Sequence, residues 1–167
     1  MISIKNKQAI DKMRTVGHAL AGIMEEVAPL LVPGATTLSI DTFFERRMRE
    51  LGLKPACKGY MGYQHATCIS VNDVVVHGVP SNDVVLAAGD CVSVDVVGSF
   101  KGYHADMARN FVVGKTTPQR QRMIAVAQQA LDIGIDAIKP GVPLGTVSAL
   151  IQEVVEQAGF GVVRDFV

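Results

Sequence analysis

Two aspartates lie in neighbouring stretches of sequence that both have the pattern of β-strands. Asp95 belongs to residues 91–97 and Asp106 to residues 103–113, and both stretches are alternating or rich in β-branched residues. A tight hairpin that turns near residues 100–101 would place the two carboxyl groups directly opposite each other, with Cβ atoms about 5 Å apart. A shift of the turn by one residue would make them diagonal neighbours, still within reach of one shared ion.

Paired carboxylates of this kind repel each other unless one takes a proton or a cation lies between them. Carboxylate oxygens suit divalent ions such as manganese, iron, cobalt or zinc. The alternative is a pair of solvated aspartates on an exposed hairpin face, which is common in antiparallel sheets. The valine-rich strand around Asp95 argues against free exposure of its side chain. The residues alone therefore leave both hypotheses open, a metal site and a solvated pair.

The elements that must hold this hairpin are helices followed by strands, which predicts an α+β fold. Apolar residues at helical spacing run over residues 10–31 and end at Pro33-Gly34. A second helix is expected from Thr37 to about residue 51, with Gly52 as its C-terminal cap. Shorter strands are expected at residues 67–70 and 74–76.

The helical pattern then recurs in the second part of the chain. Pro118 stands where a first helical residue would be, Pro140-Gly141 forms the break, and a further helix ends at Gly159. The spacing from Gly141 to Gly159 equals that from Gly34 to Gly52. We interpret this as a duplicated unit, with a first repeat over residues 6–113 and a second over residues 118–167 that has only begun its strand at residues 160–163. About half of the second unit would then be missing.

Composition narrows the class of protein. The 167 residues fit one domain, and 16 basic residues balance 16 acidic ones, which argues against a nucleic-acid-binding surface. Three cysteines without a Cys-x-x-Cys pair argue against a disulfide framework or a zinc ribbon and favour a reducing cytoplasm. Neither a signal peptide nor a stretch of about 18 apolar residues is present, so we expect a cytoplasmic protein without a membrane partner.

Several motifs in this order and spacing resemble the type I methionine aminopeptidases. They are Cys68-Ile-Ser-Val-Asn72, His77-Gly-Val-Pro80, Asp90-Cys-Val-Ser-Val-Asp95 and Gly102-Tyr-His-Ala-Asp106. The opening residues 2–5, residues 10–14 and Pro33-Gly34 fit as well, so the resemblance covers the whole chain. It implies a pita-bread fold that is incomplete here: the first pseudo-twofold half plus the helices of the second, all within one catalytic domain over residues 1–167.

The resemblance also implies roles for individual residues. Asp95 resembles the bidentate ligand of one metal, Asp106 resembles the carboxylate that bridges two metals, and His77 resembles the histidine that hydrogen-bonds the substrate near the scissile amide. The residues that resemble the walls of the methionine side-chain pocket are Cys57, Tyr60, Tyr63 and Cys68. Asn72 and Val74 resemble backbone-carbonyl contributors to a sodium or potassium site. Met61 departs from the family, which often has a histidine there.

The implied activity is removal of the N-terminal methionine from peptides and nascent chains, at the ribosome, by an enzyme that is a monomer when complete. Two divalent ions (cobalt, manganese, iron, zinc or nickel) would carry the hydrolysis. A histidine and two glutamates complete the family's ligand set, and by the resemblance they would follow Val167. We therefore expect this chain by itself to bind metal weakly and to have no measurable peptidase activity.

Two other readings compete with this one. A non-catalytic pita-bread protein could bind a ribosome or a peptide, although such a protein has no need of a carboxylate pair. An X-Pro-specific metallopeptidase would share the fold, but the pocket segment from Cys57 to Cys68 argues against it.

Overall fold

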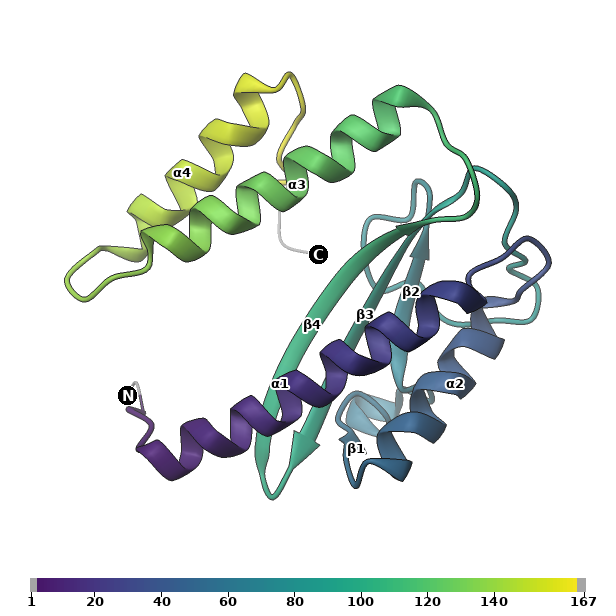
Figure 1. Cartoon of the computed structure of the whole chain (residues 1–167), viewed down its shortest axis with the longest axis horizontal. Coiled ribbons are helices and arrows are strands. Elements are labelled where there is room, and N and C mark those ends of the chain that lie inside the picture. The colour runs from purple at the N-terminus through teal and green to yellow at the C-terminus, as the bar shows by residue number, and fades with distance from the viewer. Residues whose placement is uncertain (1–2, 165–167) are drawn as a thin grey trace. The chain divides into compact units, whose positions relative to one another are not determined.

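The computed structural model describes residues 3–164 and divides into two compact units, Met1–Thr116 and Thr117–Val167. The first unit is a four-stranded sheet with two long helices, and the second is a pair of helices (Figure 1). Each unit has the helix–break–helix order that the sequence predicts.

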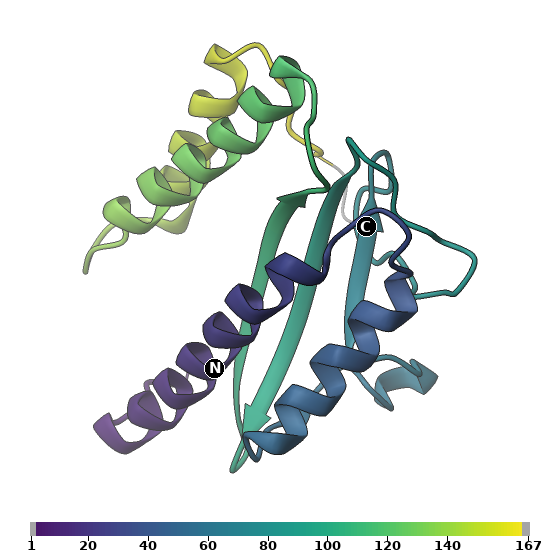
Figure 2. The same ribbon diagram turned by 45° about the vertical axis from the view of Figure 1, so that its right-hand side comes forward.

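The first unit consists of α1 (Lys7–Val27), α2 (Thr37–Glu50), β1 (Lys54–Pro55), β2 (Thr67–Val71), β3 (Cys91–Phe100) and β4 (Tyr103–Val112), with 3-10 turns at Ala28–Leu30 and Tyr60–Gly62. All strand pairs are antiparallel, and β3 is the central strand. Because β4 pairs with the whole of β3, β1 and β2 must share the other edge of β3. Both helices cross the same face of this sheet, as Figures 1 and 2 show.

Alternation along β3 separates the core from the opposite face. Val92, Val94 and Val96 are fully buried in one hydrophobic cluster with Leu20 of α1 and Phe44 of α2. Neighbouring side chains of a strand point to opposite faces, so the residues between these valines lie on the face away from the two helices. Asp95 is one of them and is half-buried there. The first unit therefore presents Asp95 on the face of its central strand that α1 and α2 do not cover.

The helices begin at side-chain caps. Asn6 accepts a hydrogen bond from the Ala9 amide at 2.9 Å, so α1 starts before the first apolar residue of the predicted helix. Thr36 caps α2 in the same way, through the amide of Ser39 at 3.1 Å. These caps explain why both helices are confirmed while the start of α1 lies earlier than predicted.

The second unit pairs α3 (Pro118–Ala137) with α4 (Leu144–Gln157). The helices pack closely at Gly134, where a Cβ atom would lie 2.8 Å from Cδ1 of Ile151. Helices α2 and α4 both have 14 residues, and each is followed by a glycine with left-handed φ, 72° at Gly52 and 77° at Gly159. The two helix pairs thus match in length and in the backbone conformation that ends them. Within residues 3–164, no helix combines the length and the apolar character that crossing a membrane requires.

Two predicted strands are wrong. Residues 74–76 follow Asn72, whose left-handed φ of 56° ends β2 and turns the chain. Residues 160–163 form no strand among the described residues, because a strand needs a hydrogen-bonding neighbour, and the last three residues of the predicted second repeat lie outside the described part. Strand β1 was not predicted, since two residues carry no readable alternation.

Candidate functional site

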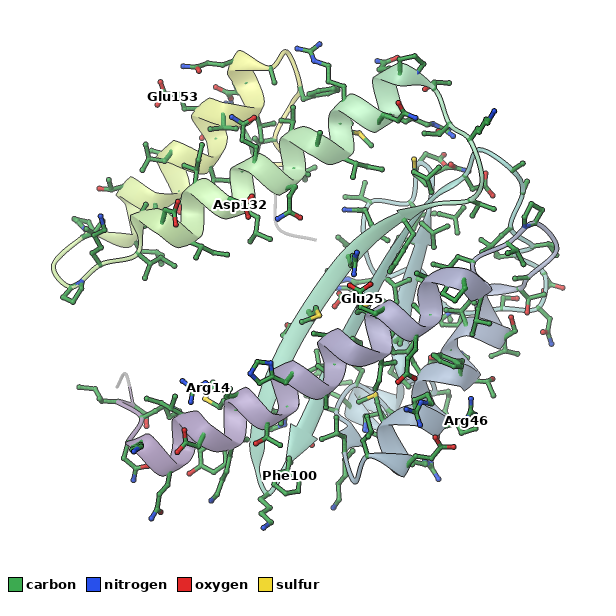
Figure 3. All side chains as sticks on the ribbon, in the orientation of Figure 1. Arg14, Glu25, Arg46, Phe100, Asp132 and Glu153 are labelled. Atoms are coloured by element: carbon green, nitrogen blue, oxygen red, sulfur yellow. The ribbon has the colours of Figure 1, made fainter. Side chains whose placement is uncertain are left out.

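The carboxylate pair lies on neighbouring strands, but its register differs from the direct pairing predicted first. Phe100, which Figure 3 labels near the tip of the hairpin, pairs with Tyr103, so the turn consists of Lys101 and Gly102. Both have left-handed φ, 50° and 81°, as the tight primed turns of β-hairpins require. Asp95 therefore faces Ala108 and Asp106 faces Val97.

Direct opposition of Asp95 and Asp106 was thus wrong, and the diagonal alternative is confirmed. Residues that pair across an antiparallel ladder share a face, so both carboxyl groups point to the same side of the sheet. Burial raises the pKa of Asp95, and the negative charge of Asp106 together with a hydrogen bond that protonated Asp95 donates to it raises this pKa further. The two groups are close enough to compete over one proton, a situation that a divalent cation would also relieve.

His77 lies near this pair, because its charge acts on Asp95 and lowers the pKa of that carboxyl group. The loop that carries His77 is held against β2: the Ile69 amide donates to the Gly78 carbonyl at 2.8 Å, and the Gly78 amide donates to Ser70 Oγ at 3.1 Å. A Cβ atom on Gly78 would lie 2.2 Å from the carbonyl oxygen of Ile69. Only glycine fits there, and His77 itself has a left-handed φ of 57°.

Three of the four predicted pocket residues lie together beside the carboxylates. The Tyr63 hydroxyl donates to the Thr67 carbonyl at 2.8 Å and accepts from Cys68 Sγ at 3.5 Å. Burial raises the pKa of the Cys57 thiol, and Cys68, Asp95 and Asp106 add to the increase through their negative charge. Desolvation likewise raises the pKa of Tyr63. Cys68 also pairs directly with Asp95 across the β2–β3 ladder, so this wall of the predicted pocket adjoins the carboxylate pair.

Tyr60 is not part of this group, because it is 71% exposed in the 3-10 turn that also exposes Met61. Asn72 lies at the end of β2, where its side chain donates to Asp90 Oδ1 at 2.9 Å and accepts from the Cys91 amide at 3.2 Å. The Val74 amide donates to the Val71 carbonyl in the same turn. These bonds shape the loop whose carbonyls the resemblance assigns to a monovalent cation.

Three residues with a part in this geometry were not predicted: Asp41, Ser70 and Gly78. Asp41 is buried on α2, and its side chain bonds to the start of β2. Its signal in the sequence was a charge next to Ile40, within the apolar stripe of the helix. Ser70 and Gly78 gave no such signal, because their contact depends on how the loop folds back on β2.

The donors fit part of a metal centre. The pair supplies hard oxygen ligands that divalent cations prefer. Among residues 3–164, no group of three or more histidine, cysteine or acidic side chains forms a cluster that could hold a metal ion. By themselves, the described residues thus provide two carboxylates rather than a full coordination shell.

Comparison with known proteins gives consistent results. The model of metallopeptidase family M24 matches residues 11–167. The chain is 39% identical to methionine aminopeptidase A of Synechocystis sp. and 40% identical to methionine aminopeptidase of Salmonella typhimurium, and each alignment covers 99% of this chain. It spans 66% and 63% of the length of these two relatives, respectively.

Solved structures agree with this relationship. A methionine aminopeptidase from Thermotoga maritima superposes with a TM-score of 0.97 at 44% identity, covering 100% of this chain and 67% of that one. A prolidase from Pyrococcus furiosus, at 20% identity and a TM-score of 0.84 over 95% of this chain and 45% of that one, shares the fold. The predicted pita-bread fold is thereby confirmed. With its family model matched over residues 11–167, this chain belongs to metallopeptidase family M24.

Proposed function

We propose that the protein removes the N-terminal methionine from peptides and nascent proteins. The observation that carries this proposal is the position of the Cys57–Tyr63–Cys68 wall beside the Asp95–Asp106 pair. A peptidase needs a pocket for the first side chain next to the metal centre that activates water, and a pocket wall beside two carboxylates supports such an arrangement. Identity of about 40% to methionine aminopeptidases over nearly the whole chain supports methionine as that side chain.

Membership of a metallopeptidase family implies divalent metal ions. We propose that Asp95 holds one ion and that Asp106 is shared by two, drawn from cobalt, manganese, iron, zinc and nickel. When bound, such ions lower the pKa of water and polarise a carbonyl. The raised pKa of Asp95 fits this role, because the site favours a positive partner at that position, whether a proton or a metal.

The side chains of this chain would then bind and orient the substrate. Cys57, Tyr63 and Cys68 offer apolar and sulfur surfaces that suit an unbranched thioether, and Tyr60 would join them at the rim. His77 would donate a hydrogen bond toward the oxygen of the scissile amide, steadying the charge that develops there. The backbone carbonyls of Asn72 and Val74 would bind sodium or potassium at the end of β2.

Other properties follow as parts of the same proposal. We infer one catalytic domain built from two pseudo-symmetric repeats, supported by the equal lengths of α2 and α4. The three free cysteines support a reducing cytoplasm, where the enzyme would act as a monomer on chains emerging from the ribosome. The polypeptide of residues 1–167 by itself would bind metal weakly and hydrolyse no peptide, since a water-activating centre needs more ligands than two carboxylates.

The test is release of methionine from a Met-Gly peptide in the presence of cobalt or manganese. We expect release by the product of the complete gene, loss of release in its Asp95→Asn variant, and no release by residues 1–167. A panel with X-Pro peptides, run beside it, separates the two kinds of metallopeptidase. Cleavage of X-Pro peptides in preference to Met-Gly, or no cleavage by the complete gene product, would overturn the proposed function.

A further inference from the structure

Asp41 is a buried carboxylate on α2 whose hydrogen bonds all go to one short segment. Only 3% of the residue is exposed. Its Oδ1 atom accepts from the Ala66 amide at 2.9 Å, from the Thr67 amide at 2.8 Å and from Thr67 Oγ1 at 2.8 Å. Its Oδ2 atom lies 3.2 Å from Nδ1 of His65. Burying a carboxylate is unfavourable unless its oxygens are satisfied, and here four partners satisfy them.

The segment that Asp41 holds, residues 65–67, lies between two residues of the pocket wall. Tyr63 precedes it and Cys68 follows it. The Tyr63 ring stands edge-on to His65 with ring centres 5.6 Å apart, and its hydroxyl donates to the Thr67 carbonyl. Cys68 Sγ contacts the same hydroxyl at 3.5 Å. These contacts of the Tyr63 side chain therefore lie on the segment bonded to Asp41 or on Cys68, the residue after it.

We propose that Asp41 is a positioning residue that sets the shape of the pocket wall formed by Tyr63 and Cys68, and through it the selection of the substrate's first side chain. The selection rests on the proposed function, whereas the placement of the wall does not. The physical reason is rigidity: α2 packs on the sheet through Ile40, Phe44 and Met48, so a charged anchor on this helix fixes the loop relative to the core.

The role of Asp41 differs from that of a residue that only fills space in the core. Apolar residues of α2 already fill the core, and an apolar residue at position 41 would make none of the four polar contacts. The bonds instead satisfy two backbone amides at the point where the loop enters β2. Loss of Asp41 would free those amides and allow the 65–67 segment to shift, carrying Tyr63 and Cys68 with it.

The three cysteines allow this to be measured on the polypeptide of residues 1–167. Cys68 lies in the wall, while Cys91 is half-buried on the same sheet face at the far end of β3 and serves as an internal control. We would follow alkylation of each thiol by iodoacetamide with peptide mass spectrometry, and the signals of the Tyr63 ring by NMR. In Asp41→Ala we expect the ratio of Cys68 to Cys91 alkylation to rise at least about threefold, with shifted Tyr63 ring signals and unchanged far-ultraviolet circular dichroism.

Two milder variants keep the proposal testable even if Asp41→Ala does not fold. Asp41→Asn keeps an oxygen acceptor for the backbone amides and loses only the charge opposite His65, so its alkylation ratio should lie between those of the native chain and Asp41→Ala. Thr67→Val removes one bond at nearly constant volume and should raise the ratio less than Asp41→Ala does. Should Asp41→Ala fail to fold, these two variants decide: a selective rise at Cys68 supports the proposal, and no change overturns it.

A parallel rise at all three cysteines would also overturn the proposal, because it would show that Asp41 supports the whole fold and not the wall. The substrate part has its own readout in the product of the complete gene. There, Asp41→Asn should lower kcat/KM for a Met-Gly peptide more than for a Leu-Gly peptide, and an equal loss for both would overturn the claim of selection. If no methionine is released but the effect at Cys68 is selective, the proposed function is overturned, whereas the role of Asp41 in positioning the wall is supported.

Discussion

Asp95 of β3 and Asp106 of β4 are diagonal neighbours that interact through their charges and through a side-chain hydrogen bond, on the sheet face that α1 and α2 leave uncovered. Burial and this neighbour raise the pKa of Asp95. A folded-state pKa above the unfolded value means that the folded chain holds this proton more tightly. Without metal, the Asp95 carboxylate therefore destabilises the fold at neutral pH, and the penalty fades as pH falls through the raised pKa.

Removing the charge of Asp95 should therefore stabilise the metal-free chain at neutral pH. Asp95→Asn should raise the melting temperature of metal-free residues 1–167 at neutral pH, by about 2–4 °C for each kcal/mol of repulsion removed. The advantage over the native chain should shrink as pH is lowered through the raised pKa, because the native carboxyl group then takes its proton. Thermal unfolding followed by circular dichroism between pH 4 and 7.5 measures both effects. The exposed Asp132 of α3 supplies a control in Asp132→Asn, which should change little at any pH (Figure 3).

Metal binding should show the opposite dependence on pH. A cation competes with the proton for Asp95, so manganese should bind residues 1–167 more tightly as pH rises through the raised pKa. With two carboxylates as ligands, we expect a dissociation constant on the order of millimolar. Calorimetric titration at pH 5.5 and 7.5 measures this, and Asp106→Asn should remove the heat. Micromolar binding that survives Asp106→Asn would contradict the assignment of Asp106.

Gly78→Ala should destabilise the chain by about 1–3 kcal/mol, because the new methyl group would meet the Ile69 backbone, which cannot move as a side chain can. The change should also displace His77, the preceding residue, and alter its NMR signals. The control is Gly17→Ala on α1, where no atom beyond the adjoining residues and backbone of the helix lies within 4 Å of the added carbon and helix propensity predicts a gain of about 0.5–1 kcal/mol. Urea unfolding of both variants gives the comparison, and a neutral Gly78→Ala would show that the clamp on β2 is not needed.

Phe44→Ala should cost about 3–5 kcal/mol, because the ring is fully buried between α2 and the sheet and its loss leaves a cavity. Phe43, its neighbour on the same helix, is only partly buried, and its ring is nearly perpendicular to that of Phe44. Phe43→Ala should therefore cost clearly less under the same denaturant titration. Equal losses would mean that the core of the first unit is not centred where the structure places it.

The sequence by itself predicted the four long helices and the two long strands that carry the carboxylate pair. Helical spacing and terminating glycines predicted α1 to α4, and two alternating runs predicted that Asp95 and Asp106 lie on one face of a hairpin. These features are local, because a period of 3.6 or 2 residues already decides which face a side chain takes. The motifs around His77 and Cys68 predicted the protein family, and the match to the M24 model confirms it.

Tertiary structure decided what depends on contacts between distant segments. The register of the hairpin followed from left-handed conformations at Lys101 and Gly102, which moved Asp95 away from direct opposition to Asp106. The bond from Thr67 to Asp41 joins residues 26 positions apart and forms only when α2 packs on β2. A pattern in sequence specifies the direction of a side chain, whereas its partner is specified by how helices and strands pack, and that is why Asp41 and Gly78 came to light only in the folded chain.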